Sequence, residues 1–194
     1  MIPARLVRAI DQKNVIAMAF AAGNSNQDCG GAPSILCINS NEGGITAAAV
    51  DRNLNPQPYS SRGPGQYSLL HPFISAPTFG VLPWGSGYLD FGELGAGTSS
   101  ATPQLSGALA ILKGEAPKAN NTVLRTALAA GARKVNSGPL PFSSATGFGL
   151  LQVDQALAWL PRARLHPLYP FIGARFAAPL RVPAARVLAG TAYG

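Results

Sequence analysis

Two short runs of apolar residues constrain the fold of this chain more than any other feature of its sequence. Residues 15–20 (VIAMAF) and 45–50 (ITAAAV) are apolar at almost every position. A strand with apolar side chains on both faces is typical of a parallel sheet that is covered on both sides. A shorter run at residues 73–76 predicts a third strand of the same kind. These runs predict an α/β fold built on a parallel sheet.

Apolar residues at helical spacing predict the first long helix of this fold. Leu105, Leu109 and Leu112 share one stripe of a helix that we expect to run from Ser99 to about Lys113. The spacing of three and four residues puts these leucines on one face. That face would cover the sheet.

Two more elements are expected after this helix. A second helix would be capped by Asn121 or Thr122 and would end at Gly131. The glycines in residues 147–149 predict a turn into a short strand or a final helix that ends near Trp159.

The chain is expected to form one domain with a tail. Residues 1–160 read as the domain, with the end of a helix at residues 3–12 and irregular, glycine-rich chain at residues 77–97. Residues 161–194 are rich in Pro, Arg and Ala and are expected to form the tail. The net charge of +7 lies mostly in that tail, which holds five arginines and no acidic residue. We therefore expect no nucleic-acid partner, and no apolar run reaches the roughly 18 residues of a membrane span.

The most informative motif for function is Gly-Thr-Ser-Ser-Ala-Thr-Pro at residues 97–103. A turn of small residues delivers Ser99 to the first turn of the predicted helix. Backbone N–H groups without intrahelical partners and the positive end of the helix dipole surround it there. This setting favours negative charge near the serine oxygen, as acyl transfer requires. Ser99 is therefore a candidate nucleophile, although a serine at a helix start can also serve only as a cap.

The same motif resembles the nucleophile signature of the subtilisin-like serine proteases, Gly-Thr-Ser-x-Ala-x-Pro, at every fixed position. Other segments resemble the same family in the same chain order. They are residues 21–24 (AAGN), 45–51 (ITAAAVD), 59–64 (YSSRGP), 74–77 (ISAP) and 147–153 (GFGLLQV). The resemblance covers about residues 5–160. It implies the C-terminal half of a three-layer, parallel-sheet catalytic domain.

The resemblance implies roles for five residues. Ser99 would be the nucleophile, and the Asn24 amide with the Ser99 backbone N–H would form the oxyanion hole. Ala21, Ala22 and Gly23 would border the substrate pocket. Asn24 can also be read as an ordinary turn residue after a strand.

The chain departs from the family in its catalytic base. In the family, the Asp strand and the His helix precede the oxyanion Asn, and the residues before Ala21 leave no room for them. Asp51, His71 and Ser99 occur in the order of a subtilisin triad. However, His71 precedes Pro72 at the start of a strand, and Asp51 lies in a turn. This triad is disfavoured.

A second order, Ser99, Asp154 and His166, matches that of the α/β-hydrolases. Those enzymes carry Gly-x-Ser-x-Gly around the nucleophile, which this chain lacks, and His166 lies in the tail. This reading is also disfavoured.

The resemblance implies a serine endopeptidase that cleaves polypeptide substrates through an acyl-enzyme on Ser99. Without the Asp and His of the triad, the chain alone is expected to be inactive, and its partner would be the missing N-terminal half. The alternative is a non-catalytic interaction module, or a protease half that pairs with a separate chain. No cofactor or metal site is expected.

The cellular compartment stays open. Cys29 and Cys37 can form a local disulfide or remain reduced. The family resemblance alone favours an extracellular location.

Overall fold

The computed structural model describes the parts of the chain that form the sheet, the helices and the site. They are residues 17–25, 44–63, 71–79, 81–83, 91–93, 96–135 and 142–165. The helix expected at residues 3–12, both cysteines and His166 lie outside these residues. Most of the expected tail, residues 166–194, also lies outside them.

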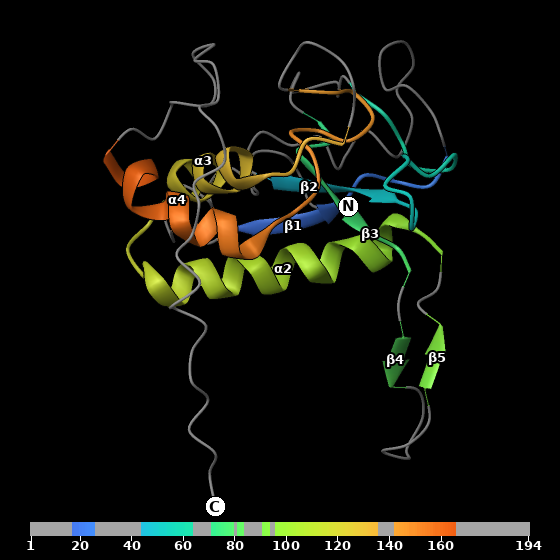
Figure 1. The fold of residues 1–194 in the computed structure, drawn as a ribbon, viewed down its shortest axis with the longest axis horizontal. Coiled ribbons are helices and arrows are strands. Elements are labelled where there is room, and N and C mark those ends of the chain that lie inside the picture. Colours follow the sequence, from blue (N-terminus) through green and yellow to red (C-terminus); the bar gives the residue numbers. More distant parts are fainter. Residues whose placement is uncertain are drawn as a thin grey trace, which may run out of the picture.

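Three parallel strands form the centre of the fold (Figure 1). Their order is β1-β2-β3, and their bounds are Met18–Ala21, Gly44–Val50 and Ile74–Pro77. The register pairs Ala19 with Ile45 and Ala47 with Ile74. All residues of β2 are buried. The apolar run at residues 45–50 therefore forms the two-sided buried strand that the sequence predicts.

The segment between β3 and the first long helix is not irregular throughout, so the expectation for residues 77–97 was wrong in part. Val81–Pro83 and Phe91–Glu93 pair as antiparallel strands β4 and β5. They project away from the body of the molecule (Figure 1). Strands of three residues offer too few positions for an alternating pattern to be visible in the sequence.

Three helices complete the described structure, with bounds α2 Thr98–Glu115, α3 Asn121–Gly131 and α4 Val153–Leu165. The cap of α3 is Asn120, whose side chain accepts a hydrogen bond from the Val123 N–H at 3.0 Å. The predicted caps, Asn121 and Thr122, are instead the first helical residues. No helix in the described residues is both long and apolar enough to cross a bilayer.

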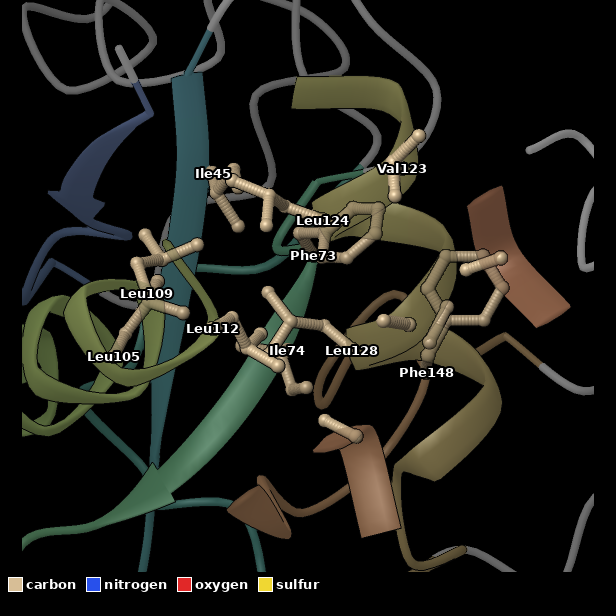
Figure 2. Close-up of a cluster of buried hydrophobic side chains, with 14 of the residues drawn as sticks. Ile45, Phe73, Ile74, Leu105, Leu109, Leu112, Val123, Leu124, Leu128 and Phe148 are labelled. Atoms are coloured by element: carbon tan, nitrogen blue, oxygen red, sulfur yellow. The ribbon is translucent and has the colours of Figure 1, made fainter. Parts of the chain in front are cut away.

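One apolar cluster joins the sheet to the helices (Figure 2). Alternate strand residues belong to it, including Ile45 in β2 and Ile74 in β3. Leu112 of α2 and the leucines of α3 point toward these strands (Figure 2). Alternation along the strands and helical spacing along α2 thus produce one shared core.

The chain between α3 and α4 closes the free side of β3. Ser75 donates its backbone N–H to the Gly149 carbonyl at 2.8 Å, and the Leu151 N–H donates to the Ser75 carbonyl at 2.9 Å. Gly147 permits this approach because it has φ +62°, and a Cβ there would lie 2.2 Å from the Phe73 carbonyl oxygen. The glycine turn predicted at 147–149 leads into one parallel bridge at Leu150 and then into α4.

Candidate active site

The candidate nucleophile lies at the first turn of α2. Gly97 precedes the helix with φ 132° and ψ 152°, a conformation that residues with a side chain rarely adopt. Ser99 is the second helical residue and is exposed. Among the described residues, no hydrogen bond occupies its N–H or its hydroxyl. We name residues 97–99 the serine turn.

Asn24 is fixed against the serine turn by its side-chain oxygen. Asn24 Oδ1 accepts two hydrogen bonds from Thr98, one from the backbone N–H at 2.8 Å and one from the hydroxyl at 2.9 Å. An amide nitrogen cannot accept either bond, so these contacts determine which end of the amide faces Thr98. The Asn24 Nδ2 donor therefore points away from Thr98.

The two nitrogen atoms expected to form an oxyanion hole border the same space. A Cβ built on Gly97 would lie 3.2 Å from Asn24 Nδ2 and 3.8 Å from the Ser99 backbone nitrogen. Because residue 97 is glycine, this space is not filled by a side chain. An oxygen atom bound beside Gly97 could face both donors, which is the arrangement that stabilises a developing oxyanion.

The residues expected to border the substrate pocket follow β1 directly. Ala21 and Ala22 are half-buried, and the Ala22 N–H donates to the Ala47 carbonyl at 3.0 Å. Gly23 is buried, and its carbonyl accepts from the Ser61 N–H at 2.9 Å. The Gly23 N–H donates to the Thr98 hydroxyl at 3.1 Å, so this segment lies against the serine turn. A role in binding substrate stays a prediction for all three residues.

Thr98 is a site residue that the sequence arguments did not single out. Its side chain is fully buried, and its hydroxyl accepts from the Gly23 N–H at 3.1 Å while donating to Asn24. The signal was present, because a threonine stands directly before the serine in the signature. Its partners could not be identified from sequence, since they lie 74 and 75 residues away.

The structure separates Asp51 from His71, two members of the disfavoured triad Asp51, His71 and Ser99. Asp51 Oδ1 accepts from the backbone N–H groups of Asn53 and Asn55, each at 2.8 Å, which is the turn role expected for it. The buried His71 ring bonds through Nδ1 to the Thr46 hydroxyl. Thr46 and Asp51 are five residues apart along β2, about 16 Å. His71 and Asp51 therefore lie toward opposite ends of the strand.

The second disfavoured combination gains no support. Asp154 is exposed in the first turn of α4, where a carboxylate is favourable beside the helix N-terminus. It accepts a hydrogen bond from Gln155 Nε2 at 3.2 Å. In the part of the chain that the structure describes, no three His, Cys, Asp or Glu side chains come together as metal ligands.

Comparison with known proteins identifies the family. The model of the Subtilase family matches residues 2–149. The chain is 35% identical over 91 residues to Subtilisin-like protease SBT3.16 of Arabidopsis thaliana, covering 44% of this chain and 12% of that relative. The match is thus to a small part of a much longer protein.

Solved structures show the same fold. The prenylagaramide maturation protease PagA superposes with a TM-score of 0.60 at 24% identity, covering 80% of this chain and 54% of PagA. A serine protease of Aeromonas sobria gives a TM-score of 0.62 at 22% identity, covering 81% of this chain and 40% of that protease. The chain thus spans about half the length of these structures or less. The family model matches most of the chain, and the chain shares the subtilisin-like α/β fold of these structures. The chain therefore belongs to the subtilase family.

Proposed function

We propose that this chain is the nucleophile-bearing half of a serine endopeptidase. Ser99 Oγ would attack the carbonyl carbon of a peptide bond, and its proton would pass to a base. Asn24 Nδ2 and the Ser99 N–H would hold the oxygen that becomes negative. The amine of the cleaved bond would leave with a proton, and water would then release the acyl group from Ser99.

One observation carries this proposal. Two N–H donors from different elements, Asn24 after β1 and Ser99 in α2, border one space beside Gly97. Both donors are held by the fold, because Thr98 binds the Asn24 oxygen and helix α2 fixes the Ser99 backbone. Donors that are already oriented stabilise a transition-state charge without rearranging. A serine that serves only as a cap needs no such second donor.

The base that accepts the Ser99 proton would have to come from residues other than those that resemble the family. Serine is a weak nucleophile at neutral pH without one. His71 is bound to Thr46, far from the carboxyl end of β2 at which Asp51 lies. The 194-residue chain alone should therefore hydrolyse unactivated peptides at a rate close to the uncatalysed rate.

The test uses an activated ester, which lowers the demand for a base. The chain is incubated with a 4-nitrophenyl ester in buffer containing imidazole, and the acylated residue is identified by peptide mass spectrometry. We expect Ser99 to be acylated in preference to Ser100. Asn24→Ala should slow this acylation by up to the roughly 100-fold that one oxyanion donor contributes. Asn53→Ala, in the exposed turn after β2, is the control and should leave the rate unchanged.

The proposal fails on a clear result. Equal labelling of Ser99 and of the neighbouring serines, or an Asn24→Ala rate equal to that of the native chain, would mean that no oxyanion hole operates here.

A second function, that of a half which pairs with a separate chain, is favoured by one observation. Met18, Ala19 and Phe20 of β1 are each half-exposed, whereas every residue of β2 is buried. Apolar residues in an outer strand are a suitable surface for another polypeptide to cover. Pairing and catalysis are compatible, because a pairing chain could also bring the base.

A further inference from the structure

A tyrosine outside the signature holds the serine turn in place. Tyr59 lies in the loop after β2, 38 residues before Gly97. Its hydroxyl oxygen accepts a hydrogen bond from the Gly97 backbone N–H at 2.9 Å. Tyr59 is half-buried and Gly97 is buried, so this bond is partly shielded from water.

The tyrosine hydroxyl is in turn held by the sheet. It donates to Thr78 Oγ1 at 3.1 Å, and Thr78 Oγ1 donates to the Val50 carbonyl at 3.3 Å. The Thr78 backbone N–H reaches the same carbonyl at 3.1 Å. Each hydroxyl therefore has one proton donor and one acceptor, and the bonds run in one direction from Gly97 to the end of β2. Such a chain of bonds orients each of its members.

The bond from Tyr59 complements those made by Thr98 and Asn24. The peptide group after Gly97 is already fixed on both sides, because its oxygen accepts from the Ser100 N–H at 3.0 Å and its N–H donates to Asn24. The peptide group before Gly97 has its N–H fixed by Tyr59. Gly97 has no side chain to restrict its rotation, so these bonds determine how it presents the next two residues.

We propose that Tyr59 is a positioning residue for Ser99. Its hydroxyl sets the orientation of the Gly97 N–H, and through the serine turn it fixes the direction of the Ser99 N–H and hydroxyl. The inference rests on the proposed function and adds a residue to it. Tyr59 acts through the backbone of Gly97.

The test is Tyr59→Phe, which removes one oxygen atom and keeps the ring. The Ser99 acylation rate is measured against ester concentration, which separates the maximal rate from the half-saturating concentration. We expect the maximal rate to fall about threefold to tenfold, the equivalent of one hydrogen bond, with the half-saturating concentration unchanged. A loss of folded protein alone would lower the amount of reacting chain but not the rate of the remainder.

A second readout examines the bond itself. Hydrogen exchange of the Gly97 amide, followed by NMR, should be about tenfold faster in Tyr59→Phe. Thr78→Val should give a smaller increase, because it leaves the Gly97–Tyr59 bond in place. Ser106→Ala is the neutral control, since the one described partner of that exposed hydroxyl is the Thr102 carbonyl of its own helix.

The outcomes separate this inference from the proposed function. If Ser99 is acylated selectively but Tyr59→Phe leaves the maximal rate or the Gly97 exchange unchanged, the role of Tyr59 is overturned and the nucleophile stands. If Ser99 is not acylated selectively in the native chain, the proposed function is overturned and the role of Tyr59 with it.

Discussion

At the scale of the residue, the single side chain of Thr98 connects the end of β1 to the start of α2. Its hydroxyl accepts from the Gly23 N–H and donates to Asn24 Oδ1, and its backbone N–H donates to the same oxygen. Because the side chain is fully buried, water cannot replace these partners. The orientation of the Asn24 amide therefore depends on Thr98.

Replacing this hydroxyl tests that dependence. Thr98→Val keeps the shape but leaves the buried Gly23 N–H without its acceptor, so the free energy of unfolding should fall by about 1–3 kcal/mol. Thr102→Val is the matched control. Within the described part of the chain its hydroxyl bonds only to the Thr98 carbonyl in α2, so its loss should cost less than about 0.5 kcal/mol. Urea unfolding measures both. Equal losses in the two variants would contradict the role of Thr98.

Local structure around a residue can be predicted from its neighbours in sequence, whereas contacts that cross the fold cannot. The seven residues 97–103 mark Ser99 as a candidate nucleophile, and that role stays a prediction. The sequence places Tyr59 only within the segment at residues 59–64 that resembles the family. Its hydroxyl partner is 38 residues away, and nothing in the local pattern indicates it.

At the scale of helices and strands, the sequence predicts an element well where burial gives its apolar residues a regular spacing. The run at 45–50 and the leucine stripe of α2 both formed as predicted. The cap of α3 was misplaced, because Asn120, Asn121 and Thr122 are all good caps by composition. Only the extended backbone of Asn120, with ψ 171°, decides among them.

Helix α4 extends beyond the end predicted for the last helix, because composition alone does not locate a helix end. It was expected to stop near Trp159, but α4 continues through Pro161 to Leu165. Proline and arginine composition suggested a tail from that point. Packing of Leu160 and Ala163 in the core supports the extra turn instead. Tertiary contacts here outweigh the loss of one helical hydrogen bond at proline.

The close packing of α3 against α4 predicts how two glycine substitutions change the free energy of unfolding. A Cβ on Gly131 would lie 2.5 Å from the Ala156 backbone nitrogen, so Gly131→Ala must push the two helices apart. We expect a loss of about 1–3 kcal/mol in the free energy of unfolding. Gly107→Ala, in α2 with nothing within 4 Å of the new carbon, should instead gain up to about 1 kcal/mol. Thermal unfolding would contradict this packing if both variants shifted in the same direction.

At the scale of the whole molecule, the described residues form one parallel sheet, and its outer strand β1 is only partly covered. Helix α2 crosses all three parallel strands, and the segment through Leu150 closes the β3 side. On the β1 side, Met18, Ala19 and Phe20 stay half-exposed. The structures it resembles are about one and a half to two times as long. A polypeptide that covers β1 would complete the sheet.

This arrangement predicts association through β1. In light scattering, the native mass of the isolated chain should rise above that of a 20.0 kDa monomer as concentration increases. Phe20→Lys places a charge in the outer strand and should shift the distribution toward monomer. Ile111→Lys, at an exposed position of α2, is the control and should leave the mass unchanged. A stable monomer at all concentrations would exclude obligatory pairing.

The long sequence separation between Asn24 and Thr98 also affects when the site can form during synthesis of the chain. These partners are 74 residues apart, and Ser75 and Gly149 are separated by the same number. At about 5–20 residues per second, a ribosome needs roughly 4 to 15 seconds to pass from Asn24 to Thr98. In the later part of that interval the residues of β1 and β2 have been synthesised, whereas those of α2 have not. The Asn24 amide and the serine turn therefore cannot come together until several seconds after Asn24 has been synthesised.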